Sequence, residues 1–75
     1  MAIASSVSEI VVTINGLATR LPQGAKVEAV IAARGLDAAW VAVAVNRSCL
    51  QRREYAQRQL VNGDEVEILT PMAGG

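Results

Sequence analysis

Apolar and polar side chains alternate along residues 9–14, which is the period of a β-strand with one buried face. Asn15 and Gly16 follow directly, and both residue types accept the positive φ angles of a type I′ turn. Residues 17–21 resume the alternation, and residues 22–24 (Pro-Gln-Gly) end it. The pattern therefore predicts a β-hairpin at the start of the folded part of the chain.

A helix is predicted next, because the apolar spacing changes from two residues to three and four. Val27, Val30 and Ile31 fall at positions i, i+3 and i+4 and so share one helix face. Gly35 is placed to end the helix as its C′ residue. The start carries no strong capping side chain, so one of residues 23–24 would have to serve as the N-cap.

The middle of the chain predicts a buried strand over residues 40–45. Its valines would line one face and Ala42 and Ala44 the other, with Trp40 filling the core where the strand begins. A turn is predicted over residues 46–48. Asparagine at its first position tolerates a left-handed backbone, but Arg47 stands second, so the type of turn stays open.

The last third of the chain alternates short structured segments with polar ones. Residues 49–52 predict a short edge strand, and residues 54–59 predict a polar connection from which Tyr55 packs back onto the core. Residues 62–64 (Asn-Gly-Asp) predict another turn. Residues 65–69 predict the final strand, with its valine and isoleucine facing inward and both glutamates outward.

The order of these elements is hairpin, helix, strand, short strand, connection and final strand. One helix across one face of a sheet is an α+β arrangement. This order predicts the β-grasp, ubiquitin-like fold, a mixed sheet of four to five strands in which the last strand lies beside the first, in parallel, at the centre. The predicted organisation is a frayed segment over residues 1–8, one domain over residues 9–69 and a flexible tail over residues 70–75.

The composition of the chain excludes several classes of function. The 75 residues carry seven basic and seven acidic side chains, so no nucleic-acid-binding surface is expected. The longest apolar run, residues 38–45, is too short to span a bilayer, and residues 1–6 lack the features of a signal peptide. One cysteine and no histidine leave neither a disulfide nor a metal-ligand set. A cytoplasmic protein without a bound cofactor, metal or membrane partner is predicted.

The candidate functional group is the carboxylate of Gly75. Gly74 and Gly75 carry no Cβ, so a tail that ends in them fits a narrow channel in another protein. Ordering residues 70–75 on binding would cost roughly 5–10 kcal/mol. A partner is therefore expected to bind the folded domain together with the tail.

The sheet face away from the helix is the candidate docking face. Small apolar side chains there would be easy to desolvate and would lose little rotamer entropy. The residues predicted for it are Val11, Ala42, Ala44, Leu69 and Met72. The alternative is that they form ordinary exposed apolar surface.

Other side chains with reactive groups favour structural interpretations. Cys49 could relay sulfur, but a small hydrophobic residue in a short strand is favoured, since free cysteine is commonly buried. Glu54, Glu65 and Glu67 are interpreted as solvated surface rather than a catalytic acid–base set, because no cleft is implied. No residue of the chain is therefore predicted to be catalytic.

Four segments taken together resemble the ThiS family, the small sulfur-carrier proteins of thiamine biosynthesis. They are Val-Val-Thr-Ile-Asn-Gly at 11–16, Val-Ala-Val-Ala-Val-Asn at 41–46, Leu-Val-Asn-Gly-Asp-Glu-Val-Glu-Ile-Leu at 60–69, and the pair Gly74-Gly75. The resemblance implies a β-grasp protein that acts as a co-substrate and not as an enzyme. It also implies that an adenylating enzyme of the ThiF type uses ATP to activate Gly75. A sulfur-donating protein would then supply the sulfur of a thiocarboxylate, and a thiazole synthase of the ThiG type would receive it.

Three alternatives stay open. The proline-containing residues 70–73 resemble the tail of molybdopterin-synthase sulfur carriers, whereas the short length favours the thiamine branch. A ubiquitin-like modifier would instead place Gly75 in an isopeptide bond to a lysine. A plain β-grasp binding domain would not need Gly74 or Gly75 at all.

Overall fold

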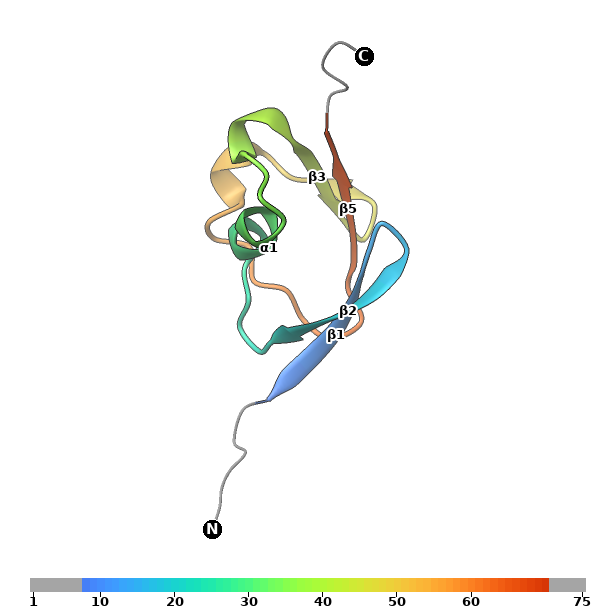
Figure 1. The fold of residues 1–75 in the computed structure, drawn as a ribbon. Coiled ribbons are helices and arrows are strands. Elements are labelled where there is room, and N and C mark those ends of the chain that lie inside the picture. The colour runs from blue at the N-terminus through green and yellow to red at the C-terminus, as the bar shows by residue number, and fades with distance from the viewer. Residues whose placement is uncertain (1–7, 71–75) are drawn as a thin grey trace.

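A mixed five-stranded sheet with one helix across one face forms the body of the molecule (Figure 1). The computed structural model describes residues 8–70. The elements are β1 (Glu9–Ile14), β2 (Leu17–Pro22), α1 (Val27–Ala33), the 3-10 turn η1 (Ala38–Trp40), β3 (Ala42–Val45), β4 (Ser48–Cys49), the 3-10 turn η2 (Arg52–Glu54) and β5 (Glu65–Leu69). Apart from Ser8 and Thr70, the predicted frayed segment and tail lie outside the described residues.

The strand order across the sheet is β2-β1-β5-β3-β4. The last strand, β5, pairs in parallel with β1 and antiparallel with β3, so it lies at the centre. This arrangement confirms the predicted α+β, β-grasp fold. It also means that β5 is supported from both sides before the chain continues into residues 70–75.

The β1–β2 hairpin follows the sequence pattern. Asn15 and Gly16 have φ angles of 51° and 84°, and Ile14 pairs with Leu17 on either side of them. Apolar side chains of β1, α1, β3 and β5 then meet in one core. Its buried members are Ile10, Val12, Ile14, Val27, Val30, Ile31, Val43, Val45, Tyr55, Leu60, Val66 and Ile68.

The C-terminus of α1 forms the predicted glycine cap. Gly35 has a φ angle of 72°, and its N–H donates to the Ala32 carbonyl at 2.9 Å. The Leu36 N–H donates to the Ile31 carbonyl at 3.1 Å, which completes a Schellman motif. Leu36 packs against the core, as the sequence pattern suggested.

The N-terminus of α1 differs from the prediction. Lys26 is the N-cap, not one of residues 23–24, and it makes no side-chain capping bond. The Val27 N–H donates to the Arg58 carbonyl at 3.0 Å, and the Glu28 N–H donates to the Tyr55 carbonyl at 2.9 Å. Backbone carbonyls from a distant segment therefore satisfy two of the N–H groups that a helix start leaves without an intrahelical partner.

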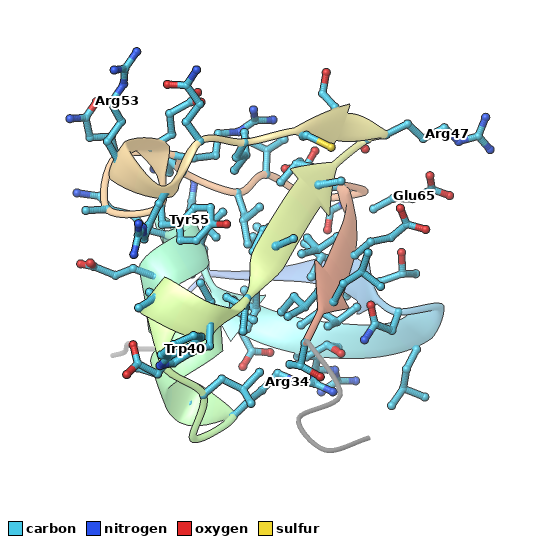
Figure 2. The ribbon with its side chains drawn as sticks, turned by 90° about the horizontal axis from the view of Figure 1, so that it is seen from above. Arg34, Trp40, Arg47, Arg53, Tyr55 and Glu65 are labelled. Atoms are coloured by element: carbon cyan, nitrogen blue, oxygen red, sulfur yellow. The ribbon has the colours of Figure 1, made fainter. Side chains whose placement is uncertain are left out.

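The prediction that Trp40 fills the core is wrong. Trp40 is 67% exposed and lies at the surface (Figure 2), because it belongs to η1 and β3 begins only at Ala42. Asp37 causes this local change, since its side-chain oxygen accepts the Ala39 N–H at 2.9 Å and caps the 3-10 turn. Tyr55 is buried as predicted, and its hydroxyl donates to the Val41 carbonyl at 3.0 Å.

The turn between β3 and β4 has two residues, and both have positive φ. The φ angle is 52° at Asn46 and 71° at Arg47. Arg47 therefore has a left-handed backbone conformation that glycine usually adopts. β4 contains only Ser48–Cys49, which makes the edge strand shorter than the predicted residues 49–52. The arginine at the second turn position is a source of local strain.

Replacing Arg47 with glycine is expected to stabilise the fold by about 0.5–1 kcal/mol. The left-handed conformation costs a non-glycine residue about 1–2 kcal/mol, from which the larger unfolded-state entropy of glycine subtracts about 0.5–1 kcal/mol. The only ion pair of Arg47 in the described part of the chain joins Nε to Glu65 Oε1 at 4.0 Å, with both side chains largely exposed, and contributes little. Urea unfolding measures the change. Arg47→Ala removes the same ion pair without relieving the backbone, so an equal gain there would contradict the explanation.

Candidate functional site

The strand that precedes the predicted tail is held from both sides. Val66 and Ile68 of β5 face the core and are buried, while Glu65 and Glu67 face outward, as predicted. β5 ends at Leu69, at the end of the molecule opposite to the start of β1 (Figure 1). Three residues of the predicted site lie outside the described residues: Gly75, which is predicted to be modified, Gly74 beside it, and Met72 of the predicted docking face.

Asparagine side chains extend the hydrogen bonding of β5 beyond its backbone ladders. Asn15 accepts the Ile68 N–H at 2.8 Å through Oδ1 and donates to the Ile68 carbonyl at 3.2 Å through Nδ2. At the other end of β5, Asn46 accepts the Glu65 N–H and donates to Asp64 Oδ1, both at 2.9 Å. Asparagines at the two hairpin turns therefore hold the two ends of the central strand.

The loop that leads into β5 is fixed in the same way. The Val11 N–H donates to Asn62 Oδ1 at 2.8 Å, and the Gly63 N–H donates to the Val11 carbonyl at 2.8 Å. Asp64 is buried, and its Oδ2 accepts the Val61 N–H at 2.9 Å. Sequence reasoning assigned these asparagines only to turns. Asn15 and Asn46 directly follow β1 and β3, and Asn62 precedes β5, but no local pattern indicates the groups that their side chains bind.

Three residues of the predicted docking face come together on the sheet face away from α1. Ala42 pairs with Leu69 across β3 and β5, and residues directly opposite each other point to the same face. Ala44 lies two residues along β3, on that face too. These three residues, called the apolar cluster below, line a shallow pocket of about 360 Å³ that also reaches Cys49 and Glu67.

Val11 is on the same face of the sheet but lies apart from the apolar cluster. Thr13 pairs with Glu65 at the start of β5, and Val11 precedes Thr13 by two residues. Val11 therefore lies toward the opposite end of the sheet from Leu69. Both side chains are exposed, at 43% and 68% respectively. The docking role of this face stays a prediction.

The glutamates of interest do not form one group. Glu65 and Glu67 point outward from β5, and Glu65 lies on the same side of the molecule as Arg47 (Figure 2). Glu54 is in η2, where its Oε2 accepts the Gln51 N–H at 2.7 Å in a capping box. Glu54 thus has a local structural function, and Glu67 places a negative charge beside the apolar cluster.

Cys49 is exposed, so its interpretation as a buried small hydrophobe is wrong. It lies in the two-residue strand β4, opposite Ala44, on the face away from α1. The position explains the exposure, because Cys49 lies on the face away from α1 and, in the described part of the chain, β4 is an edge strand with no strand beyond it.

Two further observations concern metals and membranes. Residues 8–70 contain no group of three or more histidine, cysteine, aspartate or glutamate side chains arranged to hold a metal ion. In that same part of the chain, no helix has the length and apolar character needed to cross a membrane.

A comparison with protein families adds the decisive observation, because the family model of the ThiS family matches residues 6–75. The chain belongs to the ThiS family. Among solved structures, the crystal structure of a thiamine biosynthesis protein (ThiS) from Geobacter metallireducens is similar, with 28% sequence identity and a TM-score of 0.74. The match covers 88% of this chain and 100% of that one. A search of curated proteins gives no match.

Membership of the ThiS family confirms the resemblance inferred from the sequence and supports a sulfur carrier of thiamine biosynthesis. A ThiS protein is a small sulfur carrier of thiamine biosynthesis and is not itself a catalyst. Membership also implies interaction with sulfur-activating and thiazole-forming enzymes in general. For a carrier of this kind, the structural question is how the body presents the group that bears the sulfur.

Proposed function

We propose that this ThiS protein carries sulfur as a thiocarboxylate at Gly75, formed after adenylation of the same carboxylate. The observation that supports the proposal most directly is the extent of the family match, which continues to residue 75 and so includes Gly74-Gly75. The fold is consistent with it, because the central strand β5 leads directly into residues 70–75.

The chemistry requires activation because a carboxylate at neutral pH is a poor electrophile. Attack of a Gly75 oxygen on the α-phosphorus of ATP forms an acyl adenylate and releases pyrophosphate. A sulfide equivalent from a sulfur-donating protein then attacks the carbonyl carbon, and AMP leaves with the oxygen that linked it. The resulting thiocarboxylate is nucleophilic in the same sense as an activated thiolate.

The roles of the participants follow from this sequence of steps. The adenylating enzyme of the ThiF type supplies the ATP site and the catalytic groups, and the ThiG-type thiazole synthase receives the sulfur. The chain supplies Gly75 as the reacting group and Gly74 as the residue without a side chain that lets it enter a narrow site. Tethering the sulfur to a protein raises its effective concentration at the next enzyme.

The apolar cluster of Ala42, Ala44 and Leu69 is the part of the body that we assign to docking. It lies at the end of β5 that leads into the tail, so one partner surface can contact it while the tail enters an active site. Docking on the body offsets the entropy lost when the tail is ordered, about 1–2 kcal/mol per residue. Glu67, which lies beside the cluster, could form an ion pair with a basic residue of the partner.

Incubation with ATP and the cognate adenylating enzyme, followed by intact-mass measurement, tests the proposal. We expect a mass increase of one adenylyl group, located at Gly75 by fragmentation. With a sulfur source present, it should be replaced by an increase equal to the exchange of one oxygen for sulfur. A reaction without ATP is the control. An unchanged mass with an active enzyme would refute the proposal, and high-mass lysine conjugates would favour the modifier alternative.

A further inference from the structure

The last part of β5 extends beyond the end of β1. The parallel ladder between the two strands pairs Thr13 with Glu65 and Ile14 with Val66, and its last backbone bond runs from the Asn15 N–H to the Val66 carbonyl at 2.8 Å. The chain then turns into β2, while β5 continues to Leu69. Among residues 8–70, β5 therefore has no backbone neighbour on the β1 side beyond Val66.

The pairing of β5 with β3 shows where the backbone N–H and carbonyl of Ile68 point. The Asn46 N–H donates to the Glu65 carbonyl at 2.7 Å, so the position of Glu65 is a hydrogen-bonded one in this antiparallel ladder. Hydrogen-bonded and non-hydrogen-bonded positions alternate. Glu67 and Leu69 therefore bond toward β3, and the N–H and carbonyl of Ile68 point toward β1.

The Asn15 side chain occupies the place that a continuing β1 would take. Its amide makes two bonds to one residue, accepting the Ile68 N–H at 2.8 Å and donating to the Ile68 carbonyl at 3.2 Å. A side-chain amide has the same donor and acceptor pair as a peptide group, so it reproduces one rung of the ladder. The end of β5 is thus held on both sides, by β3 at Glu67 and Leu69 and by Asn15 at Ile68, although β1 has already ended.

We propose that Asn15 is a positioning residue for the sulfur-carrying tail, fixing the point at which the chain leaves the sheet. The inference rests on the proposed function of Gly75. With Asn15 in place, β5 continues through Ile68 to Leu69, and the tail that is predicted to be flexible begins at residue 70. Without it, only β3 holds the end of β5. We then expect the exposed residue Leu69 to leave the strand, so that the segment to be ordered begins at Leu69. The adenylating enzyme must then fix about one further residue for each productive encounter.

Asn15→Gly is the direct test, and Asn46→Gly is its matched control. The two asparagines have nearly equal φ angles, 51° and 52°, which glycine accepts without strain. Each substitution removes two side-chain hydrogen bonds to β5 or its leading residue, but at opposite ends of the strand. A difference between the variants in the reaction at Gly75 therefore reports on the end of β5 and not on general loss of stability.

For Asn15→Gly we expect kcat/KM for ATP-dependent adenylation to fall about tenfold, chiefly through a higher KM, because about one further residue must be ordered. The Ile68 amide should exchange with solvent about tenfold faster, since its hydrogen bond is lost. For Asn46→Gly we expect kcat/KM and Ile68 exchange close to those of the unaltered chain. Thermal unfolding of both variants verifies that they remain folded and are destabilised to a similar extent.

The outcomes separate this inference from the proposed function. If the unaltered chain is not adenylated, the proposed function fails, and the role of Asn15 in that reaction fails with it. If the unaltered chain is adenylated and Asn15→Gly retains its kcat/KM, only the inference about Asn15 is overturned. Equal losses in both glycine variants, or unchanged exchange at Ile68 in Asn15→Gly, would overturn it as well.

Discussion

Deletion of Gly74 and Gly75 is expected to abolish adenylation and to leave a thiazole auxotroph unable to grow without added vitamin. The deletion removes the reacting carboxylate of Gly75. It also removes Gly74, which has no side chain and so lets that carboxylate enter the active site. The expected loss of activity is therefore complete. The fold should be unaffected, because the core and β5 are complete at Leu69. Intact-mass measurement and complementation of the auxotroph measure the loss, and circular dichroism verifies the fold.

Substitutions within the tail serve as graded controls for this deletion. Gly74→Ala keeps the carboxylate of Gly75 but adds a Cβ next to it, and should slow adenylation without abolishing it. Ala73→Gly removes a Cβ one position earlier and should have little effect. Growth without vitamin after deletion of Gly74 and Gly75 would contradict the proposed function and favour a plain binding domain.

Ala44→Asp is expected to weaken binding to the adenylating enzyme by more than about 100-fold, since burying an unpaired charge in an interface costs several kcal/mol. Ala44 is half-buried in the apolar cluster, where it faces Glu67 on one side and Cys49 on the other. The like charge opposite Glu67 would lower the stability of the domain by only about 0.2–1 kcal/mol. Titration calorimetry measures the affinity and urea unfolding the stability.

Two further variants separate partner docking from local repulsion. Ala44→Lys places a positive charge opposite Glu67, so any loss of binding cannot arise from repulsion within the sheet. Ala18→Asp introduces the same acid on the same face, since Ala18 pairs with Thr13, but on the edge strand β2. It should bind normally. Normal binding by Ala44→Asp would exclude this part of the face from docking.

The sequence predicted those parts of the fold that depend on local patterns. Apolar spacing located β1, α1 and β5, and Asn15-Gly16 identified a hairpin because both residues accept positive φ. Asn46-Arg47 formed a turn of the same kind, which an arginine in second position does not indicate. Periodicity also separated the inward from the outward side chains of β5, since a strand alternates its faces.

Two features that the sequence did not predict, the exposure of Trp40 and the partner of Asn15, have different physical causes. Trp40 lies in a continuous apolar run, after two alanines and before Val41. Hydropathy alone therefore extended the predicted strand back to Trp40. The Asp37 cap prevents this extension, because it places Trp40 in the 3-10 turn η1. The bonds from Asn15 to Ile68 join residues 53 positions apart, and no local pattern indicates such a partner.

The cap at the start of α1 has a consequence for how the protein is made. The helix has seven residues, well below the roughly 12–15 at which an isolated helix becomes stable in water. Its first N–H groups depend on carbonyls of Tyr55 and Arg58, which a ribosome adds some thirty residues later. An emerging chain can therefore close the β1–β2 hairpin early, whereas α1 must wait until the second half has been synthesised. Folding of the helix is thus expected only after the segment that contains Tyr55 and Arg58 has been added.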